Sequence, residues 1–136
     1  MSVEIEFPIE FIVEGVPVSI RAKKRAKRKE DWISRVRSSA LASLPENHFA
    51  TEHPVEVTIF FFSDTEIGRD LDNVIKPILD ALSGCVYIDD RQVEKLIIQR
   101  FEHGRPLILR DPSETLAEVR EMDGPRIYIK VAKAGA

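Results

Sequence analysis

The stretch from residue 54 to residue 63 constrains the fold of this 136-residue chain more than any other. It reads Pro-Val-Glu-Val-Thr-Ile-Phe-Phe-Phe-Ser, with alternating apolar and polar residues at its start and apolar residues at every position near its end. A strand with apolar side chains in both directions is buried on both faces. The segment therefore predicts a central strand in a sheet that is covered by helices.

Three other segments are predicted to be strands. Residues 3–13 alternate between apolar and polar side chains, broken only by Ile12, which places one face on a core and the other in water. Pro8 has no N–H to donate within the sheet, so this first strand should lie at an edge or contain a bulge. Residues 93–101 and 126–131 complete the predicted sheet.

Three segments are predicted to be helices. Residues 30–44 carry apolar side chains at intervals of three to four, and Pro45 stops the pattern. A second helix is predicted within residues 74–83. A short third helix is predicted to start at the capping box Asp111-Pro-Ser-Glu114, with Pro at the first helical position, and to end near Glu121.

Strands and helices thus intermix along the chain, and there is neither an internal repeat nor a linker that would split it. The sequence predicts one compact domain over residues 1–136, of the α+β (mixed α/β) class, with a mixed sheet of about four strands, two main helices and the short third one. No segment approaches the roughly 20 apolar residues of a membrane span. Cys85 has no second cysteine to pair with, which favours a reducing compartment, and we expect a cytoplasmic protein.

Charge is distributed unevenly around a net value of −3. Seven of the nine residues from Arg21 to Lys29 are basic, which is enough to neutralise several phosphates of a polyanion. A solvated loop explains the same run equally well, because one sequence does not reveal whether the charges converge.

Residues 70–94 contain five aspartates, a lysine and an asparagine among residues that form a core. Pro77 is costly inside a helix and cheap in its first turn, so the helix is predicted to start near Asn73, a good N-cap residue. Asp70 and Asp72 would then lie on extended chain, where residues two apart share a side.

Two carboxylates that converge repel each other, and a cation relieves the repulsion. Oxygen ligands alone, with no cysteine cluster and the three histidines scattered, indicate Mg²⁺ or Mn²⁺ rather than zinc. Lys76, close to those ligands, could add positive charge at a transition state. Asp89 and Asp90 are adjacent, so only one of them should reach the metal.

Each of these elements also has a purely structural interpretation. Asp70 and Asp72 could be ordinary cap and turn residues, Lys76 and Asp80 an exposed ion pair, and Asp89 with its neighbour a polar turn. Their occurrence together favours a metal-binding site.

The run Asp70-Leu-Asp72-Asn73-x-x-Lys76-Pro77-x-x-Asp80-Ala81-Leu82, followed by Tyr87-Ile-Asp89-Asp90-x-Gln92-Val93, resembles the signature of the RusA family of Holliday junction resolvases. The resemblance is strong over residues 69–100. Farther upstream, Gly15-Val-Pro17-Val-Ser19 before the basic run resembles the amino-terminal loop of the family.

The resemblance implies a homodimeric, Mg²⁺-dependent endonuclease that cuts four-way DNA junctions symmetrically. It implies that Asp70, Asp72 and Asp90 bind the metal and that Lys76 is the catalytic lysine. Asn73, Asp80 and Asp89 match the motif without a defined role. A twofold junction needs two equivalent cuts, which a C2 dimer provides.

The leading hypothesis is a RusA-like junction endonuclease acting in DNA recombination and repair. Positive side chains are expected to grip the DNA: Arg21, Lys23, Lys24, Arg25, Lys27, Arg28 and Arg69. A non-catalytic DNA-binding module of the same fold is the alternative, and a metal-stabilised scaffold without a nucleic-acid partner is a third hypothesis.

Overall fold

The computed structural model describes residues 2–18, 26–63, 71–102 and 109–135. At the ends of the elements, the description includes the backbone but not the side chains of Ala26, Ser63, Leu71, Asp72 and Glu102.

A four-stranded mixed sheet forms the centre of the fold, in the order β2-β6-β4-β5. Strand β6 (Arg126–Lys133) pairs antiparallel with both β2 (Ile9–Glu14) and β4 (Val55–Ser63), while β5 (Val93–Glu102) runs parallel to β4. The strand predicted to be central, β4, therefore has a neighbour on each side. The expected α+β domain with a mixed sheet of four strands is confirmed.

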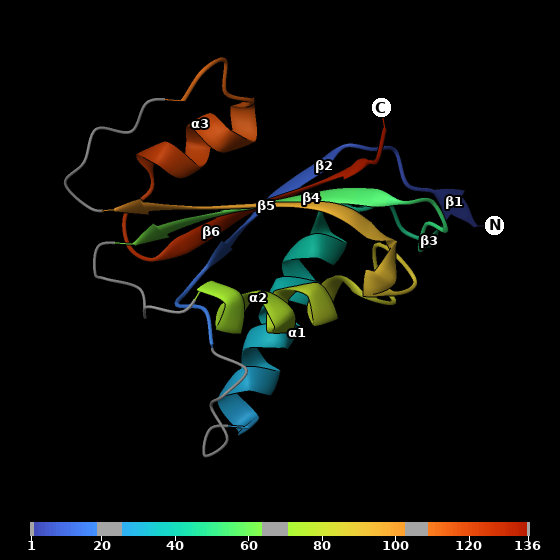
Figure 1. Ribbon diagram of the computed structural model, residues 1–136, viewed down its shortest axis with the longest axis horizontal. Helices are drawn as coiled ribbons and strands as arrows, with labels where there is room; N and C mark the ends of the chain where they lie inside the picture. The colour runs from blue at the N-terminus through green and yellow to red at the C-terminus, as the bar shows by residue number, and fades with distance from the viewer. Residues whose placement is uncertain (1, 19–25, 64–70, 103–108, 136) are drawn as a thin grey trace.

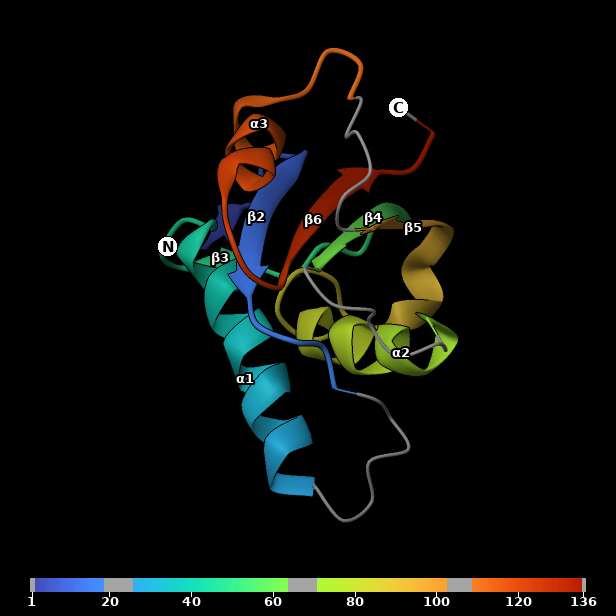
Figure 2. The same cartoon turned by 90° about the vertical axis from the view of Figure 1, so that its left-hand side faces the viewer.

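Helices cover both faces of this sheet. Helices α1 (Ala26–Ala42) and α2 (Leu71–Leu82) pack together on one face, and α3 (Glu114–Glu121) lies on the other, as both views show (Figures 1 and 2). Helix α2 leads from β4 to the parallel strand β5, so these three elements form a β-α-β unit. Among the described helices, none is long and apolar enough to cross a membrane.

The main core lies between the sheet and the pair α1 and α2. Every second residue of β4, from Val55 to Phe61, is fully buried there, together with Ile127 and Ile129 of β6. The intervening side chains point to the other face, where a smaller cluster forms beneath α3 from Phe62, Val119 and Tyr128. The double burial of β4 explains its apolar sequence.

The first predicted strand is wrong in extent. Residues 3–13 form two strands rather than one, because the chain is interrupted around Pro8, which follows a cis peptide bond. The first piece, β1 (Val3–Glu4), pairs in parallel with β3 (His48–Phe49) in a separate small sheet. The second piece, β2, is an edge strand, as Pro8 predicted.

All three helices differ at their ends from the predicted ranges. Helix α1 starts at Ala26, within the basic run, and ends at Ala42. Helix α3 has Ser113, not Asp111, as its N-cap: the Ser113 hydroxyl accepts a hydrogen bond from the backbone N–H of Leu116. Asp111 instead adopts a positive φ of 46° two residues earlier.

The start of α2 is the correction that matters for the site. The helix begins at Leu71, so Asp72 is helical rather than extended, and Asn73 is not the N-cap. Pro77 lies in the interior of the helix and is buried. Burial of this face, which includes Val74, Ile75 and Ile78, offsets the lost backbone hydrogen bond that the prediction relied on.

Candidate active site

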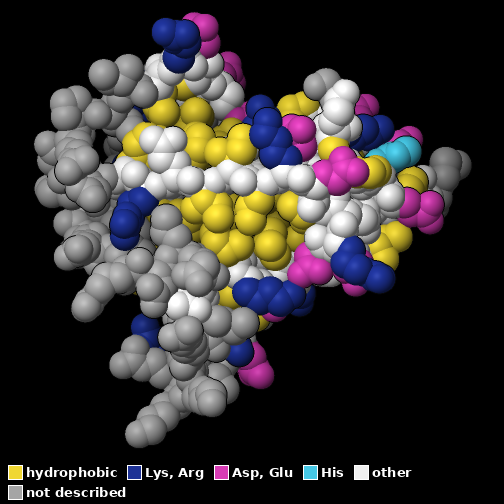
Figure 3. All heavy atoms as spheres, viewed as in Figure 1, with side chains coloured by type: hydrophobic (Ala, Val, Ile, Leu, Met, Phe, Trp, Pro, Cys, Tyr) yellow, Lys and Arg dark blue, Asp and Glu magenta, His cyan; other side chains and the backbone are white. Residues whose placement is uncertain are grey.

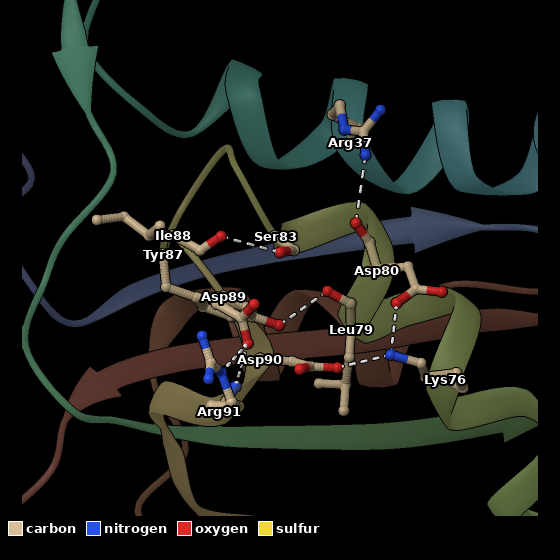
Figure 4. A network of polar contacts seen from close by, with 10 residues as sticks. All are labelled: Arg37, Lys76, Leu79, Asp80, Ser83, Tyr87, Ile88, Asp89, Asp90 and Arg91. Atoms are coloured by element: carbon tan, nitrogen blue, oxygen red, sulfur yellow. Dashed lines mark hydrogen bonds and ion pairs between the residues drawn. The ribbon is translucent and has the colours of Figure 1, made fainter.

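Lys76 lies between two carboxylates at the surface of α2 (Figure 4). Its Nζ is 2.8 Å from Oδ1 of Asp80, one turn later in the helix, and 2.7 Å from Oδ2 of Asp90, which comes from the segment before β5. The three side chains are between 31% and 47% exposed. The ammonium group is therefore fixed in position and still accessible to a ligand.

The two carboxylates raise the pKa of Lys76 above its ordinary value. The hydrogen bond to Asp80 is the largest cause, followed by the hydrogen bond to Asp90. Lys76 is consequently charged at neutral pH. In this state it can donate hydrogen bonds to an anionic oxygen but cannot accept a proton as a general base.

Asp89 and Asp90 are directed to different partners by a short 3-10 helix, η2 (Asp90–Gln92). Asp89 is its N-cap, and its Oδ1 accepts a hydrogen bond of 2.9 Å from the backbone N–H of Arg91. That N–H is the largest cause of a lowered pKa at Asp89. Capping occupies one oxygen of Asp89, whereas Asp90, the first residue of the turn, faces Lys76.

Gln92 holds the segment that carries both aspartates. Its Oε1 accepts hydrogen bonds from the backbone N–H groups of Ile88 and Asp89, at 2.9 and 3.0 Å. Its Nε2 donates to the carbonyl oxygens of Thr51 and His53, at 2.8 and 3.0 Å. One side chain thus ties the segment before β5 to the chain that enters β4, and it determines where Asp90 lies relative to α2.

Tyr87 fixes the same segment against α2. Its ring is fully buried, and its hydroxyl donates a hydrogen bond of 2.8 Å to the carbonyl oxygen of Leu79 in α2. Burial is the main reason for its raised pKa, and the negative charge of Asp90 is the next. From α1, Arg37 donates to the carbonyl oxygens of Asp80 and Ala81. The backbone that positions Lys76, Asp80 and Asp90 is therefore held by three side chains: those of Gln92, Tyr87 and Arg37.

Two of the three predicted metal ligands fall outside the described side chains. Asp70 lies outside the described residues, and only the backbone of Asp72 is described. Positions 72, 76 and 80 are spaced one turn apart in α2, so they share one face of the helix. The described residues contain no group of three His, Cys, Asp or Glu side chains that could hold a metal ion.

Some of the predicted DNA-binding residues also lie in the described part of the chain and others lie outside it. Lys27 and Arg28 are exposed in the first turn of α1. The other predicted DNA-binding residues lie outside the described part of the chain: Arg21, Lys23, Lys24, Arg25 and Arg69. Asn73 is half-buried in α2 and makes polar interactions there.

The sequence interpretation missed the role of Gln92, although a signal for it was present. Asp89-Asp-Arg-Gln92 has the spacing of a capping box, in which the N-cap side chain and the side chain at N3 bond reciprocally to the backbone. The structure contains this reciprocal arrangement. It identifies Asp89 as a capping residue and separates its role from that of Asp90.

The sequence matches the family described as Endodeoxyribonuclease RusA over residues 5–132. The chain belongs to the RusA family. The match covers every described helix and strand except β1 and the last residue of β6. No curated protein sequence matches the chain.

The RusA match assigns the chain to a family of endodeoxyribonucleases whose general activity is Holliday junction resolution. The resemblance noted at residues 69–100 therefore extends to the whole fold. Lys76, Asp80, Asp89 and Asp90 all belong to the motif that carried this resemblance. Of these four residues, the fold joins Lys76 to Asp80 and Asp90, while Asp89 caps the turn that precedes β5.

Proposed function

We propose that this chain is a Mg²⁺-dependent endodeoxyribonuclease that resolves four-way DNA junctions by symmetric phosphodiester hydrolysis in recombination and repair. The observation that carries the proposal is the Lys76 ammonium, held by Asp80 and Asp90 in a chain that matches the RusA family almost from end to end. An accessible fixed cation among carboxylates is suited to bind a phosphodiester.

In this proposal Asp70, Asp72 and Asp90 hold the metal. Three carboxylates are a donor set that fits a hard cation such as Mg²⁺, or Mn²⁺ in its place. When bound, the ion would supply an activated water and neutralise charge on the attacked phosphate. Asp90 is the described member of the set, and its side chain is only 31% exposed, held in place by Lys76.

Lys76 acts in this proposal as a permanent cation. Its raised pKa supports a role in binding a phosphate oxygen and stabilising charge as the phosphodiester is attacked. Asp80 gives Lys76 a second anionic partner, so the ammonium keeps its place if Asp90 turns to another cation. Gln92 positions Asp90 without touching the substrate.

The proposal includes a homodimer, because two equivalent sites related by a twofold axis match the two equivalent cuts in a junction. Lys27 and Arg28 in α1 would extend the DNA contact, together with the basic residues outside the described part. We place the activity in the cytoplasm, since Cys85 has no internal partner to form a disulfide with.

The test is cleavage of a synthetic four-way junction by the purified full chain. In the presence of Mg²⁺ the protein should cut the junction in preference to a linear duplex of the same sequence, with paired nicks at symmetric positions. Chelation of the metal should stop cutting without unfolding the protein, which circular dichroism would check.

Two other results would point to different functions. Junction binding that weakens steeply with salt, without cleavage in Mg²⁺ or Mn²⁺, would support the non-catalytic DNA-binding module. Thermal stabilisation by Mg²⁺ with no binding to any branched DNA would support the metal-stabilised scaffold.

A further inference from the structure

The Lys76 ammonium has two anionic partners of different kinds. Asp80 lies one turn later in the same helix, with 2.8 Å between Nζ and Oδ1, so this pair needs nothing outside α2. Asp90 lies in η2, with 2.7 Å between Nζ and Oδ2, so this pair joins α2 to the segment before β5. Figure 4 shows the ammonium between the two carboxylates. The contact with Asp80 can therefore persist when the contact with Asp90 breaks.

The backbone of Asp90 keeps its place without the ammonium. Asp90 is the first residue of η2, and the turn is capped by Asp89. Gln92 ties the same turn to the chain that enters β4 through two hydrogen bonds, of 2.8 and 3.0 Å. The ammonium can therefore leave Asp90 without removing this aspartate from the site.

A divalent cation and an ammonium that share one carboxylate repel each other. At a separation of about 5 Å this repulsion lowers the affinity for the divalent ion by a factor on the order of ten, even in water. The repulsion falls if the ammonium moves toward a second carboxylate. Asp80 is suited to receive it, because the hydrogen bond to Asp80 is the largest cause of the raised pKa of Lys76 and the bond to Asp90 ranks second.

We propose that the Lys76 ammonium competes with the metal for Asp90, and that Asp80 receives the ammonium when a metal binds. Without a divalent cation, the ammonium neutralises both carboxylates and limits their repulsion. When the site is loaded, the ammonium gives up Oδ2 of Asp90 and keeps Oδ1 of Asp80. The inference rests on the proposed function, in which Asp90 is a metal ligand. It goes further by making Lys76 and Asp80 determinants of metal affinity although neither of them is a ligand.

Metal affinity tests the inference without any DNA, by isothermal titration calorimetry of the purified full chain with Mn²⁺. Lys76→Met should lower the dissociation constant for Mn²⁺ roughly tenfold, because the competing cation is gone. This gain would accompany the loss of a side chain that the proposed reaction needs. A merely structural role of Lys76 predicts no tighter binding of the metal.

The control must remove a cation from the same region, since basic and acidic side chains adjoin at the surface where Figure 1 places α2 and the segment before β5 (Figure 3). Arg91→Met meets this requirement. Arg91 follows Asp90 in the chain but pairs with Asp89, and its side chain is 88% exposed. Because solvent and salt screen such a charge, the dissociation constant for Mn²⁺ should change by less than about threefold.

Asp80→Asn separates the exchange from a simple effect of charge. In the wild-type background it should raise the dissociation constant for Mn²⁺ roughly tenfold, because the ammonium loses the partner that receives it. In the Lys76→Met background the same substitution should raise it by less than about threefold, since no ammonium has to move. A through-space effect of the lost charge is the same in both backgrounds, so the double-mutant cycle distinguishes the two causes.

Circular dichroism would check that each variant is folded. An unchanged dissociation constant for Lys76→Met would overturn the competition, and so would an equal gain for Arg91→Met. Equal effects of Asp80→Asn in the two backgrounds would overturn the transfer to Asp80. Failure of the proposed function is distinguishable: the predicted changes in affinity without junction cleavage would refute the nuclease and support the exchange, whereas absence of Mn²⁺ binding by every protein would overturn both.

Discussion

The side chain of Gln92 makes four hydrogen bonds around the segment that carries Asp90, and Gln92→Ala removes all of them. Two of the four, from the N–H of Asp89 and to the carbonyl oxygen of Thr51, are partly buried, and the other two are exposed. Water replaces exposed hydrogen bonds at little cost, whereas each buried one contributes about 1 kcal/mol. We expect Gln92→Ala to lower the free energy of unfolding by about 2 kcal/mol.

The assay is thermal unfolding followed by circular dichroism, combined with junction cleavage well below the unfolding temperature. For a chain of this length, 2 kcal/mol corresponds to a fall in Tm of about 8 °C. Cleavage should also slow, because Asp90 loses its fixed position. Glu118→Ala, which truncates an exposed side chain of similar length on α3, is the control and should change neither quantity.

Gln92→Glu provides a sharper comparison. It keeps an oxygen for the N–H groups of Ile88 and Asp89 but places a carboxylate against the carbonyl oxygens of Thr51 and His53. We expect it to be at least as unstable as Gln92→Ala at neutral pH. A Tm for Gln92→Ala equal to that of Glu118→Ala would refute the energetic argument. A lowered Tm with unchanged cleavage would refute the positioning role.

Three further predictions concern separate parts of the molecule. Val119→Ala should lower the free energy of unfolding, measured by urea denaturation, by about 2 kcal/mol, because Val119 is fully buried against Phe62 and Tyr128. Junction cleavage should persist, since α3 lies on the face of the sheet away from α2, which carries Lys76. Loss of cleavage in the folded variant would contradict this. Lys76→Met should abolish cleavage while changing the stability by less than about 1 kcal/mol, since both ion pairs are largely exposed; a fully active variant would exclude the proposed role. The lowered pKa of Asp89 means that its ionised form stabilises the fold above the unfolded-state pKa of about 4, and that this contribution is lost as the pH falls through the lower folded-state pKa. Asp89→Asn retains an N-cap side chain, so its stability should fall less steeply in acid than that of the wild type. Identical urea midpoints for the two proteins at every pH from about 2 to 7 would contradict the capping interaction.

Much of the fold was predictable because buried positions are occupied by apolar residues, so the pattern of apolar residues in the sequence indicates which faces are buried. Residues 54–63 are apolar in both directions because β4 has a helical layer on each face, and the structure confirms that central place. Helix and strand ends were harder to predict, since they depend on contacts distant in sequence. Pro77 indicated a helix start near Asn73, but the buried face of α2 holds the proline inside a helix that begins at Leu71.

The site was predictable as a set of residues but not as a geometry. The sequence grouped Lys76 with Asp80 and Asp90, and the structure brings these three together. It did not reveal that Gln92 reaches back to Thr51 and His53, because that connection depends on how β4 and β5 pair. The metal-binding roles of Asp70, Asp72 and Asp90 remain predictions, and so do those of the basic residues in DNA binding.

The central claim is that Asp90, held against Lys76, belongs to a nuclease site. Its most direct test is the single-turnover rate constant for cleavage of a four-way junction in Mg²⁺ by Asp90→Asn, compared with Asp123→Asn at an exposed aspartate in the turn before β6. Both variants should fold and bind the junction. We predict that Asp123→Asn cuts at the wild-type rate and that Asp90→Asn is slower by a factor on the order of 1,000. Equal rates for the two variants would contradict the claim.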